Sequence, residues 1–513
     1  MIASPAFSGK RYAVLGLARS GQATVRALLA SGAKVTAWDS REEARAALRP
    51  LPFRSFGSVD PPDRPETAGG SFTRNWVGVG PVSGETPFAD MPHPPTPSPE
   101  GEGELSFADP LAISLAGFDG IVVSPGVPLN THPIAAKARE QGVPIIGDIE
   151  LFAQARASLP AHKVVGVTGT NGKSTVTALI HHICKTAGLP TTLGGNIGLP
   201  ILGQEPLPEG GVYVLELSSF QIDLTHSLDC DIAVLTNITP DHLDRYDGFE
   251  AYAASKARLF AMQRPGDIAV IAVDDEETRG IVDRLRTPPV APLAMEGMLG
   301  GPVGMPMPPI GPTVVPVSAA DVRDQSAWPA LQGPHNAQNI AVATTAARAL
   351  GIDMAAIEAA LRTYPGLPHR MERVAEVDGV LYVNDSKATN ATSAAPALGA
   401  YPKVHWILGG RRKTDDLDAC RPWFGHVVAA YTIGEATDLF ADILAREGVA
   451  VTRAHTLPDA VKLAGAVARP GETVLLSPAC ASYDQFSDYE ARGEAFRVAV
   501  AMLDHARPSG DRP

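Results

Sequence analysis

The sequence lacks the features that mark secreted, membrane-spanning or nucleic-acid-binding proteins. Four cysteines are scattered along 513 residues without a CxxC pair, which disfavours a disulfide framework and a zinc site. The first residues do not form a signal peptide pattern, and no apolar run approaches the ~20 residues of a membrane span. The 43 Lys and Arg against 56 Asp and Glu leave a net charge of −13, a poor balance for binding a phosphate backbone. We therefore expect a soluble cytoplasmic protein with no nucleic-acid partner and no membrane span.

Glycine (49) and proline (46) are abundant, and they gather in two stretches. One covers about 56–112 and includes MPHPPTPSPEGEGE, and the other covers about 288–316. Such composition cannot bury enough apolar surface to offset the entropy of the chain. We expect the first stretch to be a disordered insertion and the second a long loop at a domain edge. A proline-rich ligand for a partner module is the alternative interpretation of the first.

The chain length predicts about three domains, at roughly 100–200 residues each. Near the N-terminus, a strand at 12–15, a glycine turn at 16–21, a helix at 22–30 and a strand at 34–38 form a βαβ unit. Further strands alternate with helices over the rest of the chain, which predicts α/β domains with mainly parallel sheets. The Tyr-Pro-Gly-Leu-Pro break at 364–368 predicts a hinge before the last domain.

The segment GVTGTNGKST at 166–175 follows a predicted strand and opens a predicted helix. Backbone N–H groups of such a loop point at phosphate oxygens, a lysine reaches the transferred phosphate, and a serine hydroxyl can ligate Mg²⁺. The match to GxxxxGK[ST] is incomplete, because the first glycine should stand at Val167. The segment predicts a site for a nucleoside triphosphate. The residues expected to bind ATP are Gly169, Thr170, Asn171, Gly172, Lys173, Ser174 and Thr175.

Glu216 and His242 each follow a predicted strand, where open α/β sheets place their ligands. A carboxylate and an imidazole beside a phosphate loop are suitable ligands for a divalent ion in phosphoryl transfer. Lys256 lies on a predicted helix, and its position alone would not distinguish it from a solvated lysine.

These motifs together resemble the Mur ligase family. GVTGTNGKST, LELSSFQ, TNITPDHLDRY and ASKARLF are similar to its central ATPase domain, with folylpolyglutamate synthetase a more distant relative. GPHNAQN is similar to its adenine-side motif, and LPHR and NDSKATN to the start of its C-terminal domain. The resemblance implies a Rossmann-like UDP-binding domain at 1–151, a P-loop ATPase domain with a mainly parallel sheet at 152–366, and a Rossmann-like amino-acid-binding domain at 367–513.

Within the family, VLGLARSG, SPGV and LLSPACASYDQFSDYEARG resemble the members that add D-glutamate, and the Asp-Asn-Pro-Arg motif of the diaminopimelate- or lysine-adding members is absent. The resemblance implies ATP-dependent ligation of D-glutamate to UDP-N-acetylmuramoyl-L-alanine through an acyl phosphate, in peptidoglycan synthesis. It also implies ATP and two Mg²⁺ ions as cofactors, and we expect a monomer. A sister ligase that adds another amino acid is the nearest alternative.

The resemblance further assigns roles to individual residues. Lys173, Glu216, His242 and Lys256 are implied to be catalytic. The implied metal ligands are Ser174, Glu216, His242 and a carbamylated Lys256. The implied adenine, ribose and phosphate contacts are Asn336, Asn339, Arg370 and Asp385. Residues implied or expected to lie near the UDP substrate are Ala18, Arg19, Ser40, Arg41, Ser124, Gly126 and Asn196. The implied D-glutamate pocket consists of Lys387, Thr389, Lys413, Ser482 and Tyr489. Which of Arg411, Arg412 and Lys413 holds the glutamate side chain stays open.

Two other classes of protein fit parts of the sequence. The N-terminal βαβ unit, with Asp39 placed 18 residues after Gly21, fits a nicotinamide oxidoreductase. However, Ala18 occupies the middle glycine position of that fingerprint, and this interpretation leaves the phosphate loop unexplained. A P-loop switch that binds nucleotide without ligating is the third class, and the set of Lys173, Glu216, His242 and Lys256 argues against it.

Overall fold

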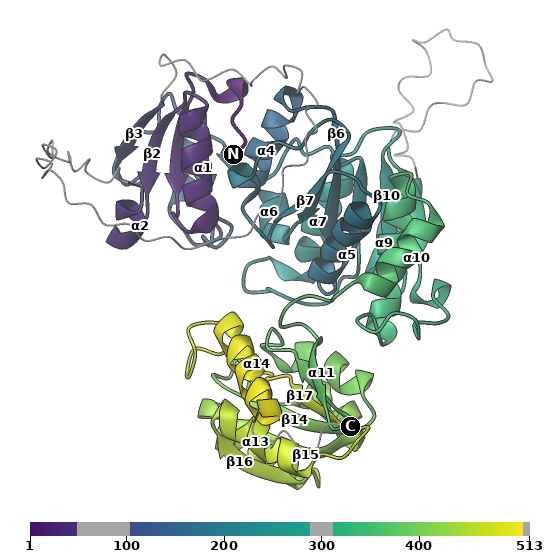
Figure 1. Cartoon of the computed structure of the whole chain (residues 1–513). Helices are drawn as coiled ribbons and strands as arrows, with labels where there is room; N and C mark the ends of the chain where they lie inside the picture. Colours follow the sequence, from purple (N-terminus) through teal and green to yellow (C-terminus); the bar gives the residue numbers. More distant parts are fainter. Residues whose placement is uncertain (49–102, 288–310, 506–513) are drawn as a thin grey trace, which may run out of the picture.

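Three α/β bodies, each built around its own sheet, make up the part of the chain that the computed structural model describes, residues 1–48, 103–287 and 311–505 (Figure 1). The predicted α/β class is confirmed. The strand predicted at 34–38 has the predicted bounds. The helix predicted at 22–30 begins earlier, at Arg19. Among the described residues, no helix is both long and apolar enough to cross a membrane.

The first body, purple in Figure 1, contains a five-stranded parallel sheet in the order β3-β2-β1-β4-β5. Its strands are β1 (Arg11–Leu15), β2 (Lys34–Trp38), β3 (Glu104–Phe107), β4 (Gly120–Val123) and β5 (Ile145–Ile146). Its helices are α1 (Arg19–Ala30), α2 (Glu42–Ala46) and α3 (Ile134–Glu140). Every residue of β4 is buried, as expected for the interior of a parallel sheet covered on both faces.

The second body contains a six-stranded parallel sheet in the order β11-β10-β9-β6-β8-β7. Its strands are β6 (His162–Thr168), β7 (Thr191–Gly195), β8 (Gly211–Glu216), β9 (Ile232–Leu235), β10 (Ile268–Ala272) and β11 (Thr313–Val317). Its helices are α5 (Lys173–Thr186), α6 (Ser219–Asp223), α7 (Gly248–Ala261), α8 (Glu276–Arg286), α9 (Pro334–Ala349) and α10 (Met354–Thr363). Because β6 lies between β8 and β9, the carboxyl ends of these two strands flank the loop that follows β6.

The third body, green to yellow in Figure 1, has a six-stranded sheet in the order β12-β13-β17-β14-β15-β16, in which β12 alone is antiparallel to its neighbour. Its strands are β12 (Glu372–Val377), β13 (Val380–Asn384), β14 (Val404–Gly409), β15 (Val427–Ile433), β16 (Val451–His455) and β17 (Thr473–Leu476). Its helices are α11 (Ala391–Ala400), α12 (Thr437–Arg446), α13 (Leu457–Val467) and α14 (Tyr489–His505).

The buried apolar residues show how the bodies are joined. One cluster runs from the first body into the second, and α4 (Asp148–Ala155), which contributes to it, crosses the predicted boundary at 151. The third body has clusters of its own. Within the predicted hinge, Tyr364 is buried in the core of the second body and Leu367 packs against that core. The third sheet begins at Glu372, so the connection between the last two bodies is short.

Both proline-rich stretches were predicted too long. Residues 49–102 and 288–310 lie outside the described residues, but the ends of the two stretches form strands. Glu104–Phe107 is the edge strand β3, whose Leu105 and Phe107 pack against the core. Thr313–Val317 is the edge strand β11, which tolerates Pro316 because an edge strand has one unpaired side. Short edge strands carry too few apolar residues to stand out beside a proline-rich segment.

Candidate active site

The glycine-rich loop between β6 and α5 has two glycines whose surroundings exclude a side chain. Gly169 has φ +143°, and a Cβ there would lie 2.0 Å from Thr236 Oγ1. Gly172 has φ +84°, and a Cβ there would lie 2.3 Å from Asn339 Oδ1. The loop ends at Lys173, the first residue of α5, and no side chain caps this helix. Its first N–H groups therefore lack intrahelical partners, and an anion is their natural ligand.

The segment after β9 holds the loop in place. The backbone N–H of Thr170 donates to the Asn237 carbonyl at 2.8 Å, and that of Asn171 donates to Asn237 Oδ1 at 2.8 Å. Asn237 Nδ2 and Thr236 Oγ1 in turn donate to the Asn171 carbonyl, at 3.1 and 2.6 Å. These bonds fix the loop before any ligand arrives, which reduces the entropy lost when phosphate binds.

The side chain of Lys173 lies against this loop and lines a cavity beside it. Its Nζ donates to the Thr170 carbonyl at 2.8 Å. Burial lowers the pKa of Lys173, and the nearby carboxylate of Glu216 partly opposes that shift. A transferred phosphoryl group would restore the missing counter-charge.

Glu216, at the end of β8, offers an unsatisfied carboxylate oxygen. The side chain is 2% exposed. Its Oε1 accepts a hydrogen bond from Asn196 Nδ2 at 2.9 Å, whereas Oε2 is buried without a partner. An unpaired buried carboxylate oxygen is costly, so this atom is suited to a cation. Ser174 lines the same cavity.

The Ser174 hydroxyl and Glu216 Oε2 together fit a magnesium ion that also takes ligands from substrates. Among the described residues, no three His, Cys, Asp or Glu side chains are grouped closely enough to hold a metal. Mg²⁺ commonly keeps several waters and binds through one or two carboxylates together with substrate phosphates. The Ser174 hydroxyl and the free oxygen of Glu216 suit that mode of binding.

Lys256 of α7 is 1% exposed and lies beneath the phosphate loop. Its Nζ donates to the Gly169 carbonyl at 2.8 Å and lies 4.5 Å from the centre of the Tyr252 ring. Burial, with a further contribution from Lys173, lowers the pKa of Lys256 to about 7. Lys256 is therefore a buried amine held against the phosphate loop and not the solvated side chain that its helical position suggested.

His242 lies in a loop that bends sharply after β9. Its φ is +52°, a conformation that costs a non-glycine residue on the order of 1 kcal/mol. Its Nε2 lies 3.6 Å from Asp241 Oδ2, and its ring centre lies 5.1 Å from that of Phe220. The half-exposed imidazole faces the cavity that Glu216 and Lys173 also line.

A cavity of about 320 Å³ lies between the second and third bodies. The four residues that the resemblance assigned to the adenine, ribose and phosphate contacts all line it: Asn336, Asn339, Arg370 and Asp385. Asn339 Nδ2 donates to Asn336 Oδ1 at 3.0 Å, which orders the pair. Burial raises the pKa of Asp385 to about 7, although a hydrogen bond from Ser477 and the charge of Arg370 oppose the shift. The structure therefore brings the predicted nucleotide contacts together beside the phosphate loop.

Two further cavities continue from the first. The second, of about 320 Å³, shares Asn171, Gly172, Arg370 and Asp385 with the first. The third, of about 340 Å³, shares Lys173, Asn196, Asp241 and His242 with the second and adds Gly126 and Lys256. The three cavities thus form one continuous path that touches all three bodies and passes Lys173 at its centre.

Comparison of the chain with known proteins identifies its family. Residues 167–294 match the model of the Mur ligase middle domain, and residues 369–480 match that of the Mur ligase glutamate ligase domain. The UDP-N-acetylmuramoylalanine–D-glutamate ligase of Novosphingobium aromaticivorans is 56% identical over 100% of this chain and 99% of its own. The chain belongs to the Mur ligase family.

Further relatives carry the same name, and two solved structures have the same fold. Proteins of the same name from Sphingopyxis alaskensis and Zymomonas mobilis are 54% and 50% identical, each over 98% of this chain and 100% of their own. Crystal structures of the UDP-N-acetylmuramate–alanine ligase of Thermotoga maritima (TM-score 0.53, 16% identity, 97% of this chain and 100% of that one) and of its MurF ligase with ADP (TM-score 0.52, 16% identity, 75% and 96%) share the fold.

In this Mur ligase, the residues predicted near the UDP substrate fall into two groups. Gly126 and Asn196 line the third cavity. Ala18, Arg19, Ser40 and Arg41, where β1 and β2 end, and Ser124, where β4 ends, are not among the residues that line it. Ser124 Oγ donates to the Gly16 carbonyl at 3.0 Å and so fixes the first turn.

Asp39 is committed to internal contacts, which argues against the nicotinamide interpretation. Its Oδ2 accepts the Leu17 N–H at 2.8 Å, and its Oδ1 accepts Arg41 Nε at 3.1 Å. Although burial raises the pKa of Asp39, the hydrogen bonds from Arg41 and Leu17 outweigh it and lower the value to about 2. A carboxylate held in this way supports the turn between β1 and α1.

On the third body, the structure separates the three neighbouring bases. Lys413 Nζ lies 3.1 Å from Thr389 Oγ1. Arg411 pairs with Glu435 at 3.1 Å, and Arg412 pairs with Asp415 at 3.3 Å. The two arginines are therefore already neutralised by carboxylates, whereas Lys413 has a hydroxyl as its neighbour.

Of the other residues predicted in the amino-acid pocket, Lys387 and Tyr489 contact each other. Lys387 Nζ lies 5.3 Å from the centre of the Tyr489 ring and lines the second cavity. Burial lowers the pKa of Lys387. Ser482 is 2% exposed and follows the end of β17.

Sequence reasoning missed two residues that shape the site. Asn237 clamps the phosphate loop, as described above. Arg245 Nη2 donates to the Val127 carbonyl at 3.0 Å, and its guanidinium lies 4.3 Å from the centre of the Phe220 ring. Arg245 therefore ties the first body to the loop that carries His242. Both residues lie in the motif TNITPDHLDRY, but no spacing rule separates them from their neighbours.

Proposed function

We propose that this chain joins D-glutamate to UDP-N-acetylmuramoyl-L-alanine at the expense of ATP, producing UDP-N-acetylmuramoyl-L-alanyl-D-glutamate, ADP and phosphate. The observation that carries the proposal is the continuous path of three cavities across Lys173. A nucleotide between the second and third bodies and a precursor between the first and second would meet at this lysine. The specificity for D-glutamate is supported by the names of relatives that are 50–56% identical over nearly the whole chain.

The first step transfers a phosphoryl group from ATP to the carboxylate of the precursor, which yields an acyl phosphate. Lys173 and the N–H groups that begin α5 balance the charge that develops on the phosphoryl oxygens. Arg370 lines the same cavity, and its buried Nε has no protein partner. Because Asn237 fixes the phosphate loop, Lys173 and the N–H groups that begin α5 need no reorganisation during the reaction.

In the second step the amine of D-glutamate attacks the acyl carbon, and the tetrahedral intermediate collapses to the amide and phosphate. Lys413 and Thr389 would bind the side-chain carboxylate of D-glutamate, with Ser482 and Lys387 near it. His242 faces the precursor side of the path, where it would orient the acceptor group or help to deprotonate the incoming amine.

Magnesium and a carbamylated lysine complete the proposal. Ser174, Glu216 and His242 would hold Mg²⁺, which supplies charge neutralisation for the phosphates, at two sites. The neutral amine of a lysine reacts with carbon dioxide, and a pKa of about 7 leaves much of Lys256 in that form at neutral pH. The carbamate would give the site a further oxygen donor.

We also propose that residues 1–151, 152–366 and 367–513 serve the UDP precursor, ATP and the amino acid respectively. One chain lines all three cavities, so a cytoplasmic monomer would be a complete active unit. Activity proportional to enzyme concentration, at a mass of one chain by light scattering, would agree with a monomer.

One assay tests the reaction. The protein is given ATP, Mg²⁺ and UDP-N-acetylmuramoyl-L-alanine, and phosphate release is measured with D-glutamate, L-glutamate, L-alanine or meso-diaminopimelate added separately. We expect release with D-glutamate alone. Release with a different amino acid would indicate a sister ligase, and release with none of them would refute the proposed function.

A further inference from the structure

Arg370 lies in a strained turn that must be held by its surroundings. The residues on both sides of it, His369 and Met371, have φ of +60° and +48°. Left-handed conformations of non-glycine residues cost on the order of 1–3 kcal/mol each and persist where the surrounding structure imposes them. Arg370 itself lines the first and second cavities. The two strained residues therefore flank Arg370, the residue of this turn that faces the nucleotide cavity.

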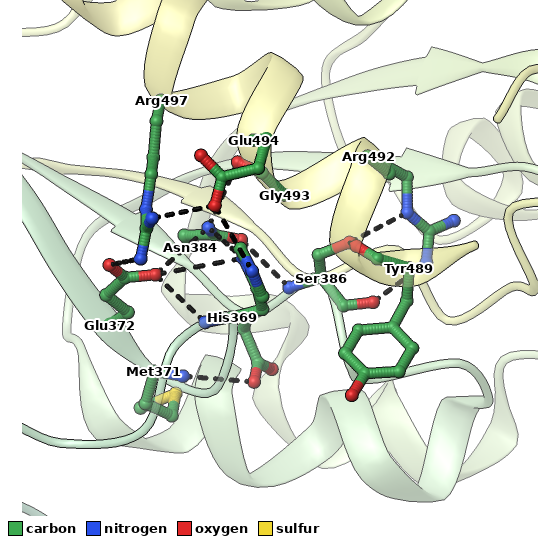
Figure 2. Close-up of polar contacts among 11 residues, drawn as sticks. His369, Met371, Glu372, Asn384, Ser386, Tyr489, Arg492, Gly493, Glu494 and Arg497 are labelled. Carbon is green, nitrogen blue, oxygen red and sulfur yellow. Dashed lines mark hydrogen bonds and ion pairs between the residues drawn. The ribbon is translucent and has the colours of Figure 1, made fainter. Parts of the chain in front are cut away.

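The start of the third sheet holds one side of this turn (Figure 2). The backbone N–H of His369 donates to Glu372 Oε2 at 2.9 Å, and Asn384 Nδ2 donates to the same oxygen at 3.2 Å. Asn384 Nδ2 also lies 3.0 Å from His369 Nδ1. On the other side, the N–H of Met371 donates to Asp385 Oδ1 at 3.2 Å. Glu372 thus anchors both the backbone and, through Asn384, the ring of His369.

The last helix, α14, holds Glu372 and His369 in turn. Arg497 forms ion pairs with Glu372 and, at 2.7 Å, with Glu494 (Figure 2). Glu494 lies 3.5 Å from His369 Nε2. The helix also approaches so closely that a Cβ on Gly493 would lie 2.1 Å from His369 Nδ1. We call Glu372, Glu494 and Arg497 the helix clasp.

We propose that the helix clasp is a set of positioning residues that hold the 369–371 turn and thereby keep Arg370 in the nucleotide cavity. The last helix of the chain would then set the affinity of the enzyme for ATP, although none of its clasp residues lines the cavities described above. The inference rests on the proposed function, which makes ATP the occupant of that cavity.

A purely structural role for the ion pairs is the competing explanation, and the chain contains a matched control for it. Arg453 also bridges two carboxylates, those of Asp438 at 3.0 Å and Asp442 at 2.7 Å. It joins β16 to α12, at the opposite edge of the same sheet from β12. Arg453→Met therefore removes an equivalent pair of contacts from the same body without touching the turn at Arg370.

The experiment compares Arg497→Met with Arg453→Met in the full chain. We expect Arg497→Met to raise KM for ATP about 10-fold, the order of effect of a displaced charge-assisted contact, and to leave KM for D-glutamate within about twofold. Arg453→Met should leave both constants within about twofold. Arg497→Lys, which keeps the charge, should recover most of the ATP affinity. Thermal midpoints and circular dichroism of each variant establish that it is folded.

The outcomes separate the explanations. If Arg497→Met leaves KM for ATP unchanged, or raises KM for ATP and KM for D-glutamate by the same factor, the clasp does not position Arg370. If Arg497→Met does not fold, Gly493→Ala carries the test, because its methyl group displaces the His369 ring while both ion pairs of Arg497 keep their partners. The same selective loss of ATP affinity is then required. Titration with ADP measures nucleotide affinity without turnover, so a failure of the proposed reaction would be recognised separately.

Discussion

Replacing Asp385 by asparagine should stabilise the third body at neutral pH while it weakens nucleotide binding. Asp385 is 4% exposed; its Oδ2 accepts from Ser477 Oγ at 2.8 Å and its Oδ1 from the Met371 N–H at 3.2 Å. Burial raises its pKa to about 7. A carboxyl group that is hard to ionise when folded lowers stability wherever the unfolded chain has already lost the proton.

The sign and size follow from the two pKa values. The unfolded chain releases this proton near 3.8 and the folded protein near 7, so the penalty grows between about pH 4 and pH 7 and is constant above. At about 1.4 kcal/mol per pKa unit the penalty reaches about 4 kcal/mol above pH 7 and about 2 kcal/mol at pH 5. With about 1 kcal/mol allowed for the altered contact with Ser477, asparagine should gain about 3 kcal/mol at pH 8 and about 1 kcal/mol at pH 5.

Scanning calorimetry of the full chain at pH 8 and pH 5 measures this difference. For a unit of this size about 3 kcal/mol corresponds to a midpoint higher by roughly 10 °C, in the transition assigned to the third body. Asp415→Asn, at an exposed carboxylate of the same body, serves as control and should change neither midpoint by more than about 2 °C. In parallel, Asp385→Asn should weaken ADP binding about 10-fold, because one charged acceptor is lost.

Two results would contradict this reasoning. A lower midpoint for Asp385→Asn at pH 8 would mean that the carboxylate is satisfied in the folded state. An equal gain at pH 8 and pH 5 would mean that the stabilisation comes from packing and not from ionisation.

Three further changes test the site itself. Gly172→Ala should lower kcat/KM for ATP about 100-fold with the circular dichroism unchanged, because its methyl group would meet Asn339 and distort the loop; near-normal kinetics would show that the loop can yield. Lys413→Met should raise KM for D-glutamate at least about 10-fold, whereas Arg412→Met should change it less than about threefold. A larger effect of Arg412→Met than of Lys413→Met would mean that Arg412 and not Lys413 binds the glutamate side chain. Removing carbon dioxide should inactivate the wild-type enzyme, and adding bicarbonate should restore its activity. Lys256→Ala should be inactive with or without bicarbonate, and full activity of that variant would exclude a role for a carbamate.

The sequence carries much of this site in its local motifs. Gly169, Gly172 and Lys173 could be predicted because a phosphate loop requires glycine conformations and a helix start within ten residues. Glu216 and His242 could be placed because Glu216 ends β8 and His242 follows β9, the two strands that flank β6 in a parallel sheet, where ligands gather. Lys256 required the family resemblance, since a helical lysine that becomes buried looks no different in sequence from one that stays solvated.

The remaining features depend on contacts between distant segments. Glu372 and Arg497 are 125 residues apart in sequence, and no local pattern indicates that they meet. The choice among Arg411, Arg412 and Lys413 depends on where Glu435 and Asp415 lie in the fold. The strands β3 and β11 escaped prediction because each is short and follows a proline-rich stretch, so that composition masked the pairing that tertiary structure provides.

The positions of β3 and β11 have a practical consequence. Each is the outermost strand of its sheet, and the connection that leads into each contains one of the two internal stretches outside the described residues, 49–102 and 288–310. Lengthening or replacing either connection leaves every inner strand of the two sheets with both of its partners. A purification tag, a fluorescent reporter or a protease site could therefore be built into the chain after residue 48 or after residue 287, which would allow this ligase to be followed or cut at will while both of its termini stay native.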